Sequence, residues 1–198
     1  MVPAICFAAL DTEALLRRLA RPAPATTPFV EVRFSKLLDQ PLVVKGQLEY
    51  HEDGALVRAV SVPFRERTEI RGEAVTVERV GKTTRRFSLK HAPELRSMLG
   101  GFAAVLGGGQ DSLKRDFNLA LTGEEQHWHL ALTPKSPSVG KYVRDIVIEG
   151  GASDPRCILV TQPDAQASVM LVGKAADATL PSPLARDWLD HFCDTGGT

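Results

Sequence analysis

The 198-residue sequence has no surplus of charge, few cysteines and no apolar run long enough to cross a membrane. Its 24 basic and 24 acidic residues cancel. A dedicated nucleic-acid binder usually carries a basic excess, because phosphate contacts supply most of its affinity. A membrane-spanning helix needs about 20 consecutive apolar residues. The composition therefore argues against a nucleic-acid binder and against a helical membrane protein.

Cysteine occurs at three widely separated positions, Cys6, Cys157 and Cys193. They are too few and too scattered to predict a disulfide framework or a zinc knuckle. Cys157 lies within the apolar segment RCILV and is interpreted as a buried strand residue.

The sequence also lacks the common catalytic motifs. GGGQDS has no lysine and Ser/Thr directly after its last glycine, and neither G-x-S-x-G nor H-E-x-x-H occurs. His127 and His129 flank Trp128 at a spacing that suits two metal ligands, but no third ligand is evident nearby. An exposed strand face whose opposite side buries Trp128 is favoured. We therefore predict no enzyme activity and no metal site.

What the sequence does contain is a series of short strand patterns with brief turns between them. Such patterns predict an antiparallel meander. The strand-like segments include FVEVRFS, VVKGQLEY, ALVRAVSVPF and the charged run at 64–89, and later NLALTG, HWHLALTP, YVRDIVIEG, RCILVTQ and SVMLVG.

Helical periodicity appears in two places. Asp11 opens an amphipathic helix that places Leu15, Leu16 and Leu19 on one face. After Pro93 the sequence forms a second apolar stripe, which Gly100 and Gly101 weaken. A short helix follows that reaches Phe117. The residues of the second stripe are Leu95, Met98, Leu99, Phe102 and Leu106.

The run FRERTEIRGEAVTVERVGKTTRRFSL, residues 64–89, is dense in charge. Strand alternation places Arg65, Arg67 and Arg71 on one side and Ile70 on the other. This favours a solvated sheet face with cross-strand ion pairs over a grip for a polyanion. A rim that docks a membrane partner or an acidic headgroup is a second interpretation of the three arginines.

The predicted fold class is α+β, an incomplete antiparallel β-barrel of about ten to eleven strands covered by short helices. A large antiparallel sheet tends to curl, and a loosely covered, half-closed barrel can enclose an apolar cavity. A fully packed interior fits the composition equally well.

The order of these elements resembles the LolA-like family of periplasmic lipoprotein carriers, and more closely its divergent LolA-related branch. The resemblance covers about residues 11–173. It is carried by VRFSK after the first helix, GQLEY at 46–50, PFRERTEIRGEAVTV, FSLKHAPELRSMLGGFAAVLGGG and LALTPKS.

The resemblance implies a periplasmic, monomeric protein whose hydrophobic cavity holds lipid or lipoprotein acyl chains. It implies an inner-membrane exporter and an outer-membrane acceptor as partners, no nucleic acid and no cofactor. An aryl-polyene or other lipid export system, or an envelope protein-sensing module on the same fold, are alternatives. The implied cavity residues are Leu48, Tyr50, Val60, Val62, Ile70, Val75, Val77, Leu95, Met98, Leu99, Phe102 and Trp128.

One position departs from the family pattern. The carriers have an Arg-Pro pair after the strand that matches GQLEY, and its arginine helps to hold the lid closed. Here the aligned residues are Glu52 and Asp53, and Arg58 is a candidate replacement. The resemblance also favours residues 1–9 as a signal-peptide remnant or disordered start, 10–174 as a single domain, and 175–198 as a tail with a possible short helix.

Overall fold

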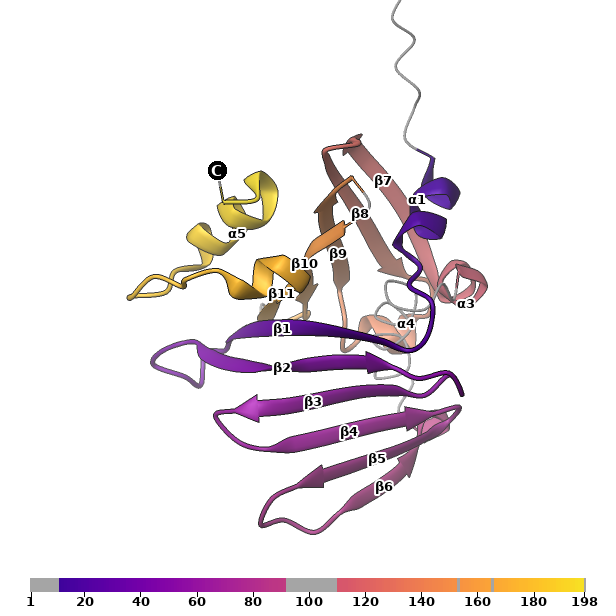
Figure 1. The fold of residues 1–198 in the computed structure, drawn as a ribbon, viewed down its shortest axis with the longest axis vertical. Coiled ribbons are helices and arrows are strands. Elements are labelled where there is room, and N and C mark those ends of the chain that lie inside the picture. Colours follow the sequence, from indigo (N-terminus) through magenta and orange to yellow (C-terminus); the bar gives the residue numbers. More distant parts are fainter. Residues whose placement is uncertain (1–10, 92–109, 153, 165, 198) are drawn as a thin grey trace, which may run out of the picture.

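The computed structural model describes residues 11–91, 110–152, 154–164 and 166–197 (Figure 1). Eleven strands form one open antiparallel sheet in the order β6-β5-β4-β3-β2-β1-β11-β10-β9-β8-β7. The strands are β1 Ala25–Phe34, β2 Leu42–Tyr50, β3 Leu56–Val62, β4 Glu66–Arg71, β5 Ala74–Arg79, β6 Arg85–Ser88, β7 Phe117–Glu124, β8 His127–Pro134, β9 Asp145–Gly151, β10 Asp154–Thr161 and β11 Ala167–Val172.

The sheet changes direction near its middle. Figure 1 shows β1 to β6 running across the view, whereas β7 to β9 run steeply in the upper part of the view, above β1. The edge strands β6 and β7 lie at opposite ends of the strand order, so the barrel is incomplete, as the sequence predicts.

Short helices cover the sheet. The α-helices are α1 Thr12–Leu19, α3 Gln110–Asp116, α4 Pro137–Gly140 and α5 Arg186–Thr195, and the 3-10 helices are η1 Leu89–His91 and η2 Gly173–Asp177. None of the helices in the described part of the chain is long and apolar enough to span a membrane.

Helix α1 begins as its sequence predicts. The Asp11 side chain accepts a hydrogen bond of 2.9 Å from the backbone N–H of Ala14, which satisfies a donor at the helix start. Leu15, Leu16 and Leu19 are completely buried, so one face of this helix contributes to the main core.

The inner face of the sheet, defined here as the face that packs against α1, carries the larger core. Alternate residues of the strands point into it, in keeping with the period of two of a β-strand. Its buried residues include Phe29, Val44, Leu48, Val60, Phe117, Trp128, Leu130, Leu132, Ile146, Ile148, Ile158, Val160, Met170 and Val172.

The outer face, defined as the face that packs against α5, carries a second core. Neither face of the central strands is left to water, because the C-terminal segment and α5 cover the outer side. The buried residues of this outer core are Val30, Val32, Cys157, Leu159, Val169, Leu171, Ala175, Leu189 and Cys193.

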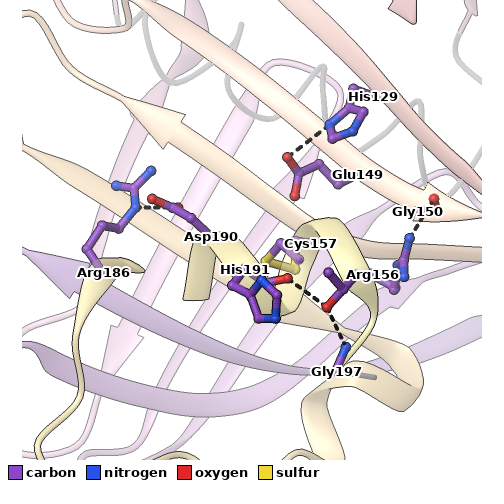
Figure 2. The surroundings of a disulfide bond; sticks show 11 residues. His129, Glu149, Gly150, Arg156, Cys157, Arg186, Asp190, His191 and Gly197 are labelled. Atoms are coloured by element: carbon purple, nitrogen blue, oxygen red, sulfur yellow. Dashed lines mark hydrogen bonds and ion pairs between the residues drawn. A yellow bond between two sulfur atoms is a disulfide. The ribbon is translucent and has the colours of Figure 1, made fainter. Parts of the chain in front are cut away.

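A disulfide joins Cys157 of β10 to Cys193 of α5, across 36 residues of sequence (Figure 2). The interpretation of Cys157 as simply a buried strand residue is therefore incomplete, and the cysteines are not too scattered to pair. Their spacing in sequence is large, but α5 folds back over β10 and brings the two side chains together.

Gly46 allows β2 and β3 to approach closely. The pairing of these strands shifts register between Lys45 and Gly46. A Cβ atom at Gly46 would overlap the carbonyl oxygen of Ala59 and press against the ring of Phe29. The bulge therefore depends on the absence of a side chain at this position.

Candidate functional site

The sheet splits where β11 ends. Strand β11 pairs with β1 as far as Val172, opposite Phe29, and then leaves the sheet as η2. Strand β1 continues past this point through residues 25–28, which pair with β2. Strand β10 likewise extends past β11 at residues 154–156. Of the described strands, none fills the space between these two extensions, which we call the split.

A cavity of about 830 Å³ occupies the split. Leu48, Ile158 and Val172 contribute apolar side chains from the inner face, and Ala175 and Phe192 contribute from the outer side. The cavity thus reaches side chains from both cores. Its volume lies within the range of about 300–1,000 Å³ that is typical of ligand pockets.

The two sides of the split are joined by an ion pair. Arg21, in the segment between α1 and β1, binds the carboxylate of Asp154 at the start of β10. Both side chains are about half exposed, so this contact adds little to stability. Arg21 and Asp154 both line the cavity, so their ion pair forms a polar part of the cavity wall.

Of the residues predicted to face a cavity, Leu48 lines this one. Val60 and Trp128 are buried in the inner core, and Tyr50 packs against it. The indole N–H of Trp128 donates to the carbonyl of Ala152 over 3.2 Å.

The remaining predicted residues lie farther along the sheet or outside the described residues. Ile70 and Val75 form a small separate cluster with Leu89, and Val77 packs against it. Val62 is 48% exposed and lies beyond the bulge in the pairing of β2 with β3. Four of the predicted cavity residues belong to the predicted glycine-weakened helix and lie outside the described residues, and they are Leu95, Met98, Leu99 and Phe102.

A buried charge cluster on the inner face was not predicted. Glu31 lies two residues after Phe29 in β1, on the same face of the sheet, and is only 7% exposed. Its carboxylate accepts hydrogen bonds from Arg33, at 2.8 and 2.9 Å, and from Arg58. Burial alone would raise the pKa of Glu31, but the hydrogen bonds and charges of the two arginines more than offset it and lower that pKa.

Arg58 is therefore engaged within the sheet. Its guanidinium lies 4.9 Å from the ring centroid of Phe29 and also 3.9 Å from a carboxylate oxygen of Glu66. Asp53, one of the two residues at the position of the family's Arg-Pro pair, binds Arg71 on the outer face. The sequence did contain a signal for the inward position of Glu31. The alternation of residues in FVEVRF places Glu31 on the same face as Phe29.

Charged side chains of the run at 64–89 form ion pairs on the outer face of β4. Arg67 lies 3.5 Å from Glu49 and 3.7 Å from Glu69, and Arg71 lies 3.0 Å from Glu69. These are the cross-strand ion pairs that alternation predicts. Glu66 precedes Arg67 in β4 and faces the opposite way, inward toward Arg58.

Acidic and imidazole groups surround the disulfide (Figure 2). His129 places its Nδ1 atom 3.1 Å from Glu149 and its Nε2 atom 3.4 Å from Asp194. Burial raises the pKa of Glu149, and although His129 opposes this change, Asp194 adds to it. Candidate ligand atoms of Glu149 and the two cysteines lie within 4.8 Å of one another, but both sulfurs are already committed to the disulfide.

Comparison with known proteins gives a family match over most of the chain. Residues 4–193 match the family described as outer membrane lipoprotein carrier protein LolA-like. No curated protein matches the sequence.

Several solved structures are similar at low identity. The LolA superfamily protein NE2245 from Nitrosomonas europaea is 12% identical, with a TM-score of 0.47 and coverage of 91% of this chain and 100% of that one. A chain of the Pseudomonas aeruginosa MucA/MucB complex is 15% identical, with a TM-score of 0.40 and coverage of 91% and 60%. LprF from Mycobacterium bovis is 12% identical, with a TM-score of 0.35 and coverage of 87% and 97%.

Proposed function

We propose a function that starts from one established premise, that this chain belongs to the LolA-like family of outer membrane lipoprotein carriers. The protein shields acyl chains of a lipoprotein or another lipid in its cavity while they cross the periplasm. An inner-membrane exporter delivers this cargo and an outer-membrane acceptor receives it. The protein performs no bond chemistry.

The cavity in the split is the observation that supports this proposal. It is large enough for a ligand, and Leu48, Ile158 and Val172 give it an apolar wall continuous with the inner core. Transfer of each CH₂ group from water to such a wall is favourable by about 0.8 kcal/mol. An acyl chain can therefore be held without directional contacts.

The disulfide supports the proposed compartment. Disulfides form and persist in oxidising compartments such as the bacterial periplasm, and they are rare in the cytosol. The bond between Cys157 and Cys193 is buried in the outer core. This location suits a structural bridge that forms during folding in the periplasm.

Displacement of an uncharged, polarity-sensitive fluorescent probe by long-chain amphiphiles tests the proposal. The wild type is expected to bind the probe and release it when an amphiphile is added. Thr27 is half-buried, lines the cavity and pairs with Leu48. A Thr27→Trp variant should bind at least 10-fold more weakly, because the larger side chain occupies space in the cavity.

Thr122→Trp is the matched control, because Thr122 is an exposed strand residue of β7. This variant should bind like the wild type. Wild-type protein that binds no probe or amphiphile contradicts the proposal, as does equal binding by the Thr27→Trp variant. If the wild type binds an unfolded envelope polypeptide and binds no lipid, the result supports the envelope protein-sensing module instead.

A further inference from the structure

Cationic side chains are concentrated at the cavity, although the whole chain carries no net charge. Arg21, Arg156 and Lys174 line it together with a single carboxylate, Asp154. Arg21 and Asp154 neutralise each other as an ion pair. Within the described ranges, neither Arg156 nor Lys174 has an acidic partner, so the cavity carries two unneutralised cations.

Arg156 is held in a fixed position beside the cavity. Its Nη2 atom donates to the carbonyl of Gly150 over 2.9 Å, as Figure 2 shows. Gly196 adopts a left-handed conformation (φ 78°) against this guanidinium, where a Cβ atom would overlap Nη1. The Nε atom of Arg156 is buried and has no hydrogen-bond partner among the described residues.

The disulfide adds to this fixed geometry. Cys157 follows Arg156 directly in β10, and its partner Cys193 lies three residues before Gly196. The guanidinium therefore lies between Gly150 of β9 and Gly196 just after α5, and the disulfide joins α5 to the strand that carries Arg156. A guanidinium that is already oriented loses little freedom when it binds an anion.

We propose that the cavity binds an amphiphile with an anionic head, such as an acidic phospholipid, and not a neutral or zwitterionic one. This inference rests on the proposed function, because the chain of the amphiphile lies against Leu48, Ile158 and Val172. The head lies at Arg156 and Lys174. Hydrogen bonds to a charged group are about twice as strong as neutral ones, so these two residues select the head while the apolar wall holds the chain.

The test compares two lysolipids with the same acyl chain as competitors for the uncharged probe. Lysophosphatidylglycerol has an anionic head, whereas lysophosphatidylcholine is zwitterionic. The wild type should prefer lysophosphatidylglycerol by about 10-fold, the effect of one charge-assisted hydrogen bond. Glycerol 3-phosphate, which has the anionic head without a chain, should not displace the probe at the same concentrations.

The double variant Arg156→Gln/Lys174→Gln should lose the preference, so that the two lysolipids displace the probe equally well. Lys174→Gln alone, at an exposed position, should reduce the preference without any risk to folding. The matched control is Lys82→Gln/Lys141→Gln, which removes two exposed lysines that lie outside the cavity lining and should keep the full preference.

Three results would overturn the inference and leave the proposed function standing. They are equal binding of both lysolipids by the wild type, a full preference in the double variant, and displacement of the probe by glycerol 3-phosphate as effective as that by lysophosphatidylglycerol. Failure of both lysolipids to displace the probe would contradict the proposed function itself, and with it this inference.

Discussion

Glu31 is a buried acid on a largely apolar face, and it depends on its arginines. Removal of a carboxylate from water costs several kcal/mol unless opposite charges and hydrogen bonds compensate. Arg33 and Arg58 provide that compensation from two strands. Arg58, the candidate replacement for the family's lid arginine, is therefore paired with Glu31 within the sheet.

Arg58→Met should lower the free energy of unfolding by about 3 kcal/mol, because it leaves the Glu31 carboxylate buried with one partner fewer. Urea unfolding at neutral pH measures the loss. The double variant Glu31→Leu/Arg58→Met should recover much of it, since it removes the buried charge as well. A loss below about 0.5 kcal/mol in the single variant would show that the pair contributes nothing measurable.

Glu149 should produce the opposite pH dependence to a salt-bridged acid. Folding raises its pKa above the ordinary value of 4.5, so the folded state favours the protonated form. Its stabilising contribution is therefore complete below pH 4.5 and is lost as the pH rises through the folded pKa.

Glu149→Gln mimics the protonated form at every pH. The variant should gain stability relative to the wild type as the pH rises from 4 toward neutral, as measured by urea unfolding at a series of pH values. Glu124→Gln, an exposed carboxyl on β7, is the control and should give a constant difference. A difference that is also constant for Glu149→Gln would show that its charge has no cost in the folded state.

Individual strands were largely predictable, because their alternation and turns are local features of the sequence. The turns at residues 72–73 and 80–84 separate β4, β5 and β6, and each contains a glycine with a positive φ, Gly72 and Gly81. The interpretation of residues 64–89 as a solvated sheet face is likewise confirmed by the ion pairs of Arg67 and Arg71. The alternation of side chains between the two faces follows from the strand backbone, so it can be recognised in a single sequence.

The second core was not predicted, although a signal was present. The segments Cys157–Val160 and Val169–Val172 are continuous apolar runs without alternation, which is typical of strands buried on both faces. Which segment covers the outer face cannot be read from a pattern, because α5 reaches it through a loop that contains two prolines, Pro181 and Pro183. The disulfide and the split depend on that same long-range placement.

Loss of the disulfide should affect both stability and binding. The variant Cys157→Ala/Cys193→Ala should lose about 4 kcal/mol of unfolding free energy, from the 36-residue separation that the bond closes. Amphiphile binding should weaken as well, because Phe192 of α5 and Gly196, which follows the helix, line the cavity.

Chemical denaturation with and without dithiothreitol measures this loss. Reductant should destabilise the wild type and leave the double variant unchanged, which separates the bond from general effects of the reagent. Wild-type protein whose stability and binding are insensitive to complete reduction would show that α5 is held by its apolar contacts alone.

The whole molecule is a single curved sheet with a different cover on each face. Helix α1 lies over the inner face and α5 over the outer face, and the cavity is located where β11 stops short between β1 and β10. The cavity therefore arises from the different lengths of neighbouring strands in the sheet. This explains why the cavity residues implied by the family resemblance included Leu48 but did not indicate the split itself.

Mass spectrometry of protein purified from the envelope without detergent tests the carrier function most directly. The wild type should retain an acyl-chain amphiphile in a defined stoichiometry. Thr27→Trp, purified in parallel, should retain much less, and Thr122→Trp should match the wild type. Wild-type protein that carries no amphiphile, and takes none up from added lipid, would contradict the central claim.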